Sequence, residues 1–453
     1  MSSPTRGGQA GIRPGSRRGT LLLLVWLFLG PLVPAGPARG GRGGDPAVLA
    51  RVLLASLESP GGEPADLERE LRSLGLDAFD ELFEALAAEA IPARWLGEAQ
   101  PRPLGGVEIL ALRDALAGMP PALLQGRLRE LAEAAYDPAE RRAALAVLEP
   151  LAGARDLGLL LVLAAPPGPD DALPRELRTE LQRALGAALG RAPEGVELLA
   201  SAWQRAHPAL LAPIARSIGR TDDVRALAAL AGLLGSEPAL DSLLLAELAR
   251  LGAALPHPLP SGALGRVRAH LEGCPPEQLR LAAFAAGQLE DHAAIPRLLE
   301  LLERGDEGVR RIAHGALRAV TGLRFPPDPE RWGSWHAAEV DWWQRESAAC
   351  LAGLRDPDPA RVARSIRELA WHRLHRHELA AALLDSLRAP RGELVRLAAA
   401  ALGNLESELA LPALTALLDG ADPDLAATAR AAILRIGRAR AARAPGHGDE
   451  NGG

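Results

Sequence analysis

Three histidines near residue 375 have the types and spacing that come nearest to a metal or catalytic site. They lie in the segment WHRLHRHE as His372, His375 and His377. His372 and His375 are three residues apart, so on a helix both imidazoles could bind one metal ion. The H-E-x-x-H pattern of zinc proteases is missing, because Ala381 occupies the position of its second histidine. We therefore expect a polar, partly exposed helix end, with no metal ligand and no catalytic residue.

A tryptophan-rich stretch, residues 322–347, is the second candidate for a functional site. The chain has eight tryptophans and an aromatic fraction of 3%, yet four of the eight lie here. The candidate contact residues are Trp332, Trp335, Trp342 and Trp343, with Arg331 and Arg345 beside them. Tryptophan and arginine are common anchors of protein interfaces, so the stretch could bind a protein, peptide or glycan. The interpretation that we prefer is a hydrophobic plug that covers helix faces between two blocks of the chain.

The spacing of the four tryptophans sets an expectation for each ring. Trp332 and Trp335 are three residues apart and share one face of a helix. Trp342 and Trp343 are adjacent, so they cannot both face the same core. We expect the first two to pack as the plug and one of the second two to stay accessible to a partner.

The absence of lysine narrows the possible chemistry. All 51 basic residues are arginine. P-loop phosphate binding, the kinase strand lysine and Schiff-base chemistry all need a lysine amine, so we exclude them. The G-x-S-x-G motif of serine hydrolases is also missing. We therefore expect no enzymatic activity. The rival interpretation is an envelope enzyme, or a protein that handles a metal or cofactor through the histidines or the tryptophan stretch.

The first 38 residues have the composition of an export signal. Four arginines precede the apolar run LLLLVWLFLGPL, residues 21–32. This run is shorter than the roughly 20 apolar residues that span a bilayer. Small residues follow it, which predicts cleavage near Ala35 or Ala38, before a Gly/Arg-rich linker at 39–44. We expect a periplasmic or extracellular protein. The alternative is an uncleaved segment that anchors the chain to the membrane.

The charge and the cysteines limit the possible partners. The whole chain has a formal charge of −6, and removal of residues 1–35 takes away four arginines and no acid, which leaves −10. An acidic protein repels phosphates, so we expect no nucleic-acid partner. The two cysteines, Cys274 and Cys350, fit no metal or haem motif. They could pair in an oxidising compartment or remain two buried free thiols.

An internal repeat organises the C-terminal half of the chain. Residues 280–302 align with residues 396–418 without a gap, and 13 of the 23 positions are identical. A coding bias towards Ala and Leu cannot explain the matches of rarer residues, which are Arg280 with Arg396, Gly287 with Gly403, Glu290 with Glu406, and Pro296 with Pro412. Each copy has apolar residues at helical spacing, a Gly near the end of one helix and a Pro in the first turn of the next. The pattern therefore predicts that each unit forms a pair of helices.

The repeat pattern resembles the HEAT family, in the short bacterial form that is also called PBS-lyase-like HEAT repeats. The matching residues are Val395, Arg396, Ala398, Leu402, Gly403, Leu405, Pro412, Leu414, Leu417, Leu418 and Asp422. This resemblance implies a ladder between neighbouring units, formed by a loop Asp and a helix Arg, with Asp306 and Arg310 in those roles. It implies no bilin-attaching activity, because no residues match such a site.

The rest of the chain keeps the rhythm of helix pairs, and no alternating run of Val, Ile and Thr predicts a strand. We predict an all-α fold, an α-solenoid of stacked HEAT-like helix pairs in which each pair contacts its neighbours. Its parts are a degenerate repeat region at 45–274, HEAT-like repeats at 275–438 with the insertion 322–347, and a disordered tail at 439–453. This architecture implies a scaffold for unknown protein partners that carries no cofactor.

Overall fold

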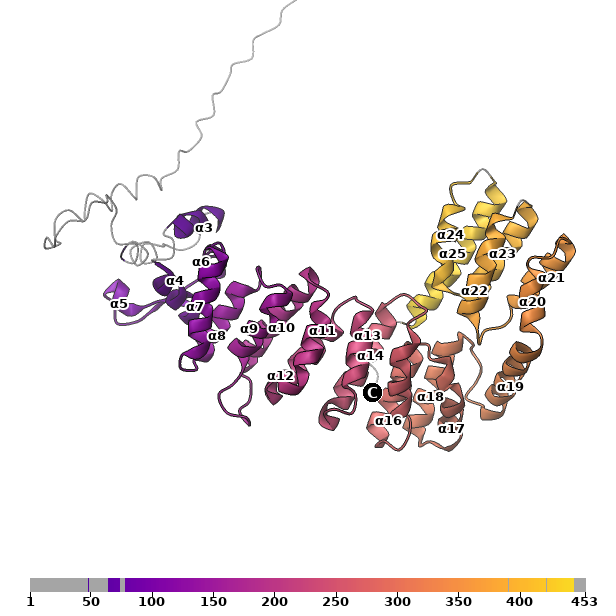
Figure 1. The fold of residues 1–453 in the computed structure, drawn as a ribbon, viewed down its shortest axis with the longest axis horizontal. Coiled ribbons are helices and arrows are strands. Elements are labelled where there is room, and N and C mark those ends of the chain that lie inside the picture. Colours follow the sequence, from indigo (N-terminus) through magenta and orange to yellow (C-terminus); the bar gives the residue numbers. More distant parts are fainter. Residues whose placement is uncertain (1–47, 49–63, 74–77, 390, 421, 444–453) are drawn as a thin grey trace, which may run out of the picture.

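The computed structural model describes residues 48, 64–73, 78–389, 391–420 and 422–443 (Figure 1). The predicted signal segment 1–38 and linker 39–44 therefore lie outside the described residues. No helix in the described ranges is long and apolar enough to cross a membrane.

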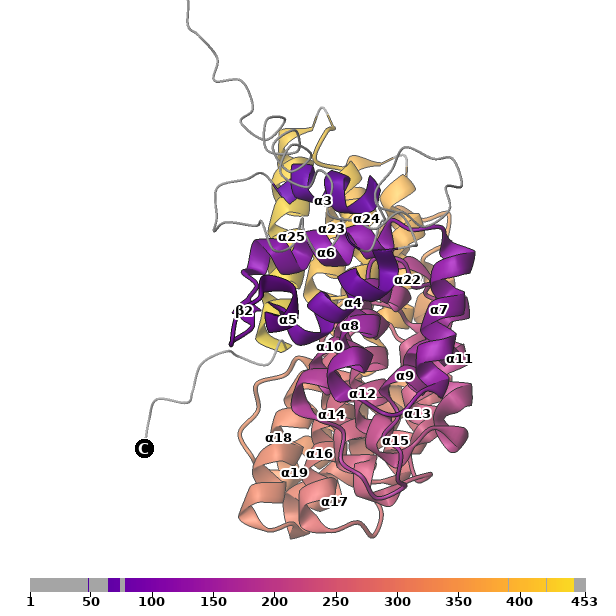
Figure 2. The same cartoon turned by 90° about the vertical axis from the view of Figure 1, so that its left-hand side faces the viewer.

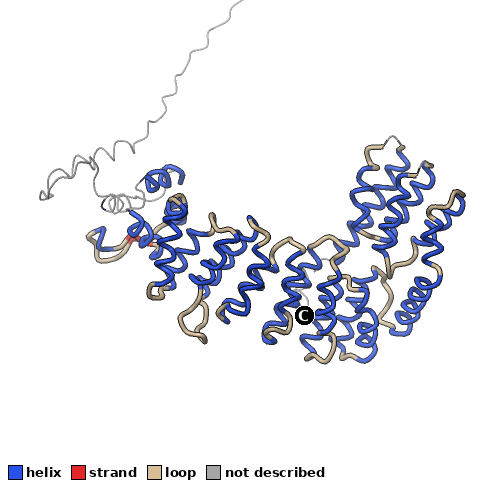
Figure 3. The backbone as a smooth tube through the Cα atoms, in the orientation of Figure 1, coloured by secondary structure: helices blue, strands red, loops and turns tan. Residues whose placement is uncertain are grey.

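Helices dominate the described chain, so the all-α prediction is confirmed (Figure 3). The first group of helices is α3 (Pro64–Ser73), α4 (Phe79–Ala88), α5 (Ala93–Leu96), α6 (Gly106–Ala117), α7 (Pro121–Glu133), α8 (Pro138–Leu148), α9 (Leu157–Ala164), α10 (Arg175–Arg191), α11 (Gly195–Ala202), α12 (Pro208–Gly219), α13 (Arg225–Leu233), α14 (Asp241–Ala254), α15 (Leu264–Ala269), α16 (Pro276–Gln288), α17 (Ile295–Arg304) and α18 (Glu307–Thr321). The second group is α19 (Pro329–Arg345), α20 (Ser347–Gly353), α21 (Pro359–Leu369), α22 (Arg376–Leu384), α23 (Gly392–Leu405), α24 (Leu411–Ala416) and α25 (Pro423–Arg443).

A small antiparallel sheet interrupts the first group. Its strands are β1 (Ala90–Ile91) and β2 (Arg102–Pro103), with Ala90 opposite Pro103. The sequence gives no strand signal here, because two-residue strands are too short to show alternation.

Asp-Pro pairs start many of the helices. The side chains of Asp137, Asp328 and Asp358 each accept a hydrogen bond from a backbone N–H of the first turn. The following proline occupies the first helical position in each case, where its missing N–H costs nothing. Asp306 also caps α18 with its side chain, at 2.8 Å from the Val309 nitrogen, although no proline follows it.

The helices form two layers, as a solenoid requires. Alternate helices contact each other along the row α8, α10, α12, α14, α16 and α18, and the row α7, α9, α11, α13 and α15 packs beside it. After α18, helices α19 and α20 turn the chain, and α22 to α25 return towards the end of the first row (Figures 1 and 2). We call α3–α18 the first stack and α21–α25 the second stack.

Each stack has its own apolar core, built mainly from Leu and Ala. The first core includes Trp332, and the second includes Trp342. Helix α19 therefore supplies one tryptophan to each core and links the two stacks.

The first five residues of the predicted tail, 439–443, belong to helix α25. Helix α25 continues through these residues, and the Arg440 side chain reaches back to the first stack. Its guanidinium donates to the Ala254 carbonyl oxygen at 3.2 Å and lies 3.5 Å from the Glu408 carboxylate. Residues 444–453 are outside the described ranges.

Candidate functional site

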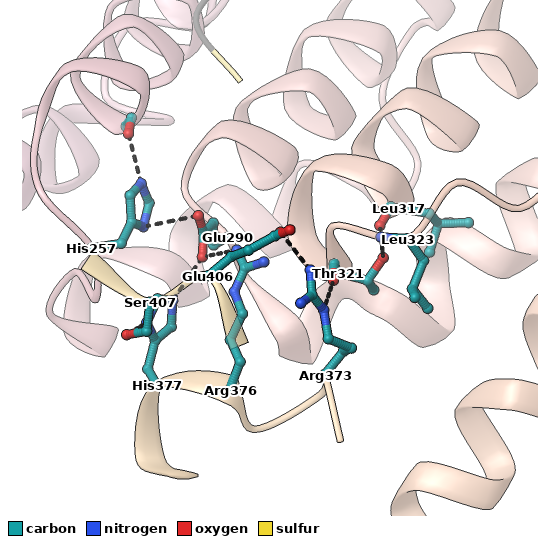
Figure 4. Close-up of polar contacts among 11 residues, drawn as sticks. His257, Glu290, Leu317, Thr321, Leu323, Arg373, Arg376, His377, Glu406 and Ser407 are labelled. Atoms are coloured by element: carbon teal, nitrogen blue, oxygen red, sulfur yellow. Dashed lines mark hydrogen bonds and ion pairs between the residues drawn. The ribbon is translucent and has the colours of Figure 1, made fainter. Parts of the chain in front are cut away.

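The junction between the two stacks holds a group of buried polar side chains that contact one another. The segment between α21 and α22 contacts the C-terminal ends of α18 and α23, and the start of α22 contacts Glu290, which follows α16 (Figure 4 shows these side chains). From this segment, Arg373 donates to the Thr321 carbonyl oxygen at 3.1 Å, to the Asn404 carbonyl oxygen and to the Glu406 carboxylate. The arginine thus joins backbone of the first stack to backbone of the second.

Glu290 is the centre of the buried group. It follows α16 with a φ of 52°, a left-handed conformation that turns its side chain into the junction. Its carboxylate is ion-paired with Arg376, which is 1% exposed, and accepts a hydrogen bond from the His377 Nε2 atom at 2.7 Å. The His377 Nδ1 atom lies 2.8 Å from the Ser407 Oγ atom. Glu290 itself is 5% exposed, so these contacts replace its hydration.

His257, from the loop after α14, completes the group on its other side. Its Nε2 atom lies 2.8 Å from the Gly252 carbonyl oxygen, which can only accept, so that nitrogen carries the hydrogen. The Nδ1 atom then faces the Glu290 Oε1 atom at 3.9 Å. The rings of His257 and His377 are stacked, with centroids 6.3 Å apart.

Burial shifts the ionisation of these groups. Desolvation, together with the charge of Arg376, lowers the pKa of His377 and of His292 to about 3, so both imidazoles are neutral at pH 7. Desolvation lowers the pKa of Arg376 to about 10, so this guanidinium stays charged. The junction therefore combines a buried ion pair with neutral imidazoles.

Among the described residues, one group has the donors and proximity for a metal ion, and it is His257, Glu290 and His377. A cavity of about 430 Å³ lies beside it and is also lined by His292, Asp291 and Glu378. Two imidazoles and one carboxylate are ligands that transition metals accept.

A second cavity, of about 530 Å³, is lined in part by Arg376 and is rich in arginine. Its charged lining residues are Arg311, Arg318, Arg324, Arg376, Arg435, Arg438 and Glu406. Phe284, Ile312 and Leu323 supply apolar walls. We call this the arginine cavity. It collects six positive charges against one negative charge in a chain whose formal charge is −6.

The segment in which the sequence predicts a helix end lies between α21 and α22, with His372 and His375 outside both helices. His372 stacks on Trp342 with centroids 3.3 Å apart, and His375 stacks on Trp343 at 3.7 Å. The His372 Nδ1 atom lies 3.1 Å from the Glu339 carboxylate. The two imidazoles therefore order the aromatic rings of α19, and the third histidine of the segment, His377, is the one that enters the buried group.

The tryptophans of the predicted contact surface differ in exposure. Trp332 is 0% exposed and donates from Nε1 to the Pro326 carbonyl oxygen at 3.0 Å. Trp342 is 7% exposed, whereas Trp335 and Trp343 are half-buried. Arg331 is exposed with its guanidinium 4.6 Å from the centre of the Phe325 ring, and Arg345 is ion-paired with Asp341. Neither Trp332 nor Trp342 presents its ring to a partner in this conformation.

The most exposed large apolar side chain of the described residues is Trp371, at 75%. The sequence analysis does not single it out, because Trp371 lies outside the tryptophan-rich stretch, in the turn that follows α21. His257 and Glu290 are also missed, since they lie far from His377 along the chain. The signal for Glu290 is its match to Glu406 in the internal repeat.

The ladder that the family resemblance implies at Asp306 and Arg310 is not formed by those residues. Asp306 caps its own helix, and Arg310 approaches Glu307 at 4.0 Å. A pair between neighbouring units occurs instead between Arg396 and Asp424, at 3.5 Å. The cysteines are separate, half-buried free thiols, Cys274 and Cys350, and burial raises the pKa of both.

No protein-family model matches the chain, and no curated protein matches it. Similar solved structures include an engineered protein with 17% identity and a TM-score of 0.29, covering 86% of this chain and 99% of its own. A mutant of Kap121p has 12% identity and a TM-score of 0.29, covering 87% of this chain and 50% of its own. Human deoxyhypusine hydroxylase in complex with glycerol has 16% identity and a TM-score of 0.19, covering 70% of this chain and 98% of its own. Scores this low carry no argument about function.

Proposed function

We propose that this chain is a non-catalytic scaffold of the HEAT-repeat type, which binds an acidic protein segment in the arginine cavity between its two stacks. The observation that supports this is the concentration of six arginines around one cavity in an otherwise acidic protein. A concave site of one charge sign attracts ligands of the opposite sign and speeds their association.

Half of these arginines are available for a ligand. Within the described residues, Arg318, Arg324 and Arg438 are exposed and make no hydrogen bond or ion pair with another side chain. A guanidinium binds a carboxylate through two parallel N–H···O bonds, which gives direction as well as affinity. Three free guanidinium groups around one cavity are suited to several carboxylates at once.

The remaining lining favours a peptide over a nucleic acid. Phe284, Ile312 and Leu323 can accept apolar side chains that alternate with the acidic ones. A nucleic acid would extend beyond the cavity onto a surface whose net charge is negative, where its phosphates are repelled. We therefore assign the cavity to an acidic segment that also carries apolar residues.

The test is the binding of a fluorescent peptide of alternating Glu and Leu to the full chain, followed by anisotropy. We expect Arg324→Ala and Arg438→Ala each to weaken binding about tenfold, the equivalent of about 1.4 kcal/mol for one charge-assisted contact. Arg304→Ala is the matched control, because Arg304 is 80% exposed and lies outside the cavity. Added salt should weaken the wild-type complex.

Three results would overturn the proposal: no binding, equal binding by all variants, or inorganic phosphate binding in the cavity while the peptide does not. The last result would assign the site to a small anion.

Export belongs to the same proposal and rests on residues 1–38 of the sequence. N-terminal sequencing of protein from the native host tests it. We expect the chain to begin just after Ala35 or Ala38, and an intact Met1 would argue against export by a cleaved signal.

A further inference from the structure

We propose that His257, Glu290 and His377 bind one divalent transition-metal ion, with zinc as the probe, and that this ion fastens the two stacks together. This inference is independent of the arginine cavity and its partner. One ligand atom from each residue lies within 4.8 Å of the other two, and all three side chains are buried. The surrounding helices therefore hold the three donors close together before any ion arrives.

One distance between these donor atoms is shorter, and one is longer, than the distance between two ligand atoms in a tetrahedral metal site. With metal–ligand bonds of about 2.0–2.2 Å, tetrahedral ligand atoms lie about 3.3–3.6 Å apart. Here the His257 Nδ1 atom is 3.9 Å from the Glu290 Oε1 atom, and the His377 Nε2 atom is 2.7 Å from the Glu290 Oε2 atom. Both distances lie within about 1 Å of that tetrahedral range.

Each ligand also has the outer partner that orients a metal-bound side chain. The His257 Nε2–H group donates to the Gly252 carbonyl oxygen, which leaves Nδ1 as the ligand atom. The His377 Nδ1 atom is beside the Ser407 hydroxyl group, which leaves Nε2 as its ligand atom. Arg376 is ion-paired with Glu290 Oε2, so Oε1 is the oxygen turned towards His257. Such partners are the usual supports of a metal-bound imidazole and carboxylate.

An open coordination position faces the neighbouring cavity of about 430 Å³. His292 lines this cavity, and its ring centre is 6.3 Å from that of His377. The His292 Nε2 atom is buried and has no hydrogen-bond partner among the described residues. It can act as a fourth ligand or hold a metal-bound water molecule.

The positive charge of Arg376 opposes a second cation, and nearby acids offset it. Glu406 and Glu408 both interact with Arg376, and Glu378 lies in the wall of the cavity. Two imidazoles with a single carboxylate suit zinc, cobalt or iron, whereas calcium and magnesium prefer ligand sets made of oxygen. We therefore expect zinc and cobalt to bind and calcium not to bind.

The ligands come from both stacks, which gives the ion a mechanical role. His257 and Glu290 follow α14 and α16 of the first stack, while His377 lies on α22 of the second. An ion that binds the folded junction stabilises it by mass action, so melting should become dependent on metal concentration.

The test uses the full chain, from which metal is first removed by dialysis against a chelator and to which zinc is then added. We expect one zinc ion per chain by elemental analysis, a higher melting temperature on zinc addition, and a visible absorption band when cobalt replaces zinc. His257→Gln should lower zinc affinity at least about 100-fold, and Ser407→Ala, which retains all three ligands, about 10- to 100-fold. His336→Gln is the control, because His336 is half-buried and lies outside the group.

Circular dichroism of the metal-free variants shows whether each one folds, and Ser407→Ala decides the question if His257→Gln does not fold. The proposal is overturned by substoichiometric zinc, by unchanged affinity in folded Ser407→Ala, or by loss of the metal in His372→Gln. The first result would mean that His257 and Glu290 interact through a proton and not through a metal ion. The last would move the site to the histidine pair suggested by the sequence.

Discussion

The two matched repeat units share a turn conformation after their first helix and differ in the chemistry of that turn. Glu290 and Glu406 occupy equivalent positions, with φ values of 52° and 54°. Glu290 is 5% exposed and contacts Arg376, whereas Glu406 is half-buried and contacts Arg373. The left-handed conformation costs a non-glycine residue roughly 1–2 kcal/mol. The repeat accepts this cost in both copies, because each turn directs a carboxylate towards an arginine at the junction, Arg376 or Arg373.

The residues that follow each glutamate make the two loops functionally different. Asp291 and His292 follow Glu290, whereas Ser407 and Glu408 follow Glu406. His377 contacts both loops, through Glu290 in the first unit and Ser407 in the second. A duplicated helix pair thus retains its packing while its loop residues diverge, and the junction between the copies gains a buried polar group.

The largest expected effect concerns the helix that joins the two stacks. Trp332→Ala should destabilise the first stack by about 3–5 kcal/mol, because it removes a fully buried ring from the first core. Trp342→Ala should have a similar effect on the second stack. Chemical denaturation measures both changes, and hydrogen exchange shows which helices lose protection.

Trp371→Ala is the control for these substitutions, since its ring is 75% exposed and its loss should change stability by no more than about 0.5 kcal/mol. Loss of protection spread equally over both stacks after Trp332→Ala would show that the two cores unfold as one unit.

The second prediction separates the two glutamates. Glu290→Ala should cost about 3–5 kcal/mol, because it leaves the buried Arg376 without its nearest carboxylate. Glu406→Ala should cost less, about 1–2 kcal/mol, because its partner Arg373 retains two carbonyl acceptors. Urea unfolding of metal-free protein measures the difference. Equal costs would mean that burial does not distinguish the two loops.

The sequence predicts the repeat better than it predicts the junction. Helix pairs follow from local signals such as apolar spacing, Asp-Pro starts and the register of Gly287 with Gly403. These signals can be recognised in one sequence. The metal-binding donors of the junction give no such local signal, because His257, Glu290 and His377 meet only after the second stack folds back on the first. The tryptophan-rich stretch is visible in the sequence, but its distribution over two cores depends on the same return of the chain.

A third prediction tests whether the packing of the two copies is equivalent. A Cβ atom added to Gly287 would lie 2.8 Å from the Ala316 Cα atom, and one added to Gly403 would lie 2.8 Å from the Ala432 Cα atom. Gly287→Ala and Gly403→Ala should each therefore cost about 1–3 kcal/mol through overpacking. Thermal melts of the two variants should shift by similar amounts.

Gly186→Ala provides the matched control within helix α10. An added Cβ atom meets nothing within 4 Å there, so the substitution should stabilise the helix by about 0.5–1 kcal/mol. If only one of Gly287→Ala and Gly403→Ala lowered stability, the two copies would share a sequence register without sharing the same packing.

The smallest expected effect concerns the arginine that the two copies share on their first helix. Arg396 lies 3.5 Å from Asp424 of the next unit, but the two side chains are 39% and 79% exposed. In the first copy, Gly308 occupies the position equivalent to Asp424, so Arg280 lacks that carboxylate. Arg396→Ala should cost about 0.2–0.5 kcal/mol at low salt and nothing measurable at 1 M salt, where the Debye length falls to about 3 Å. Arg280→Ala should cost nothing at either salt concentration. A salt-insensitive loss above about 1 kcal/mol for Arg396→Ala would mean that the ladder between units is structural, and that its absence from the first copy is compensated by the buried junction.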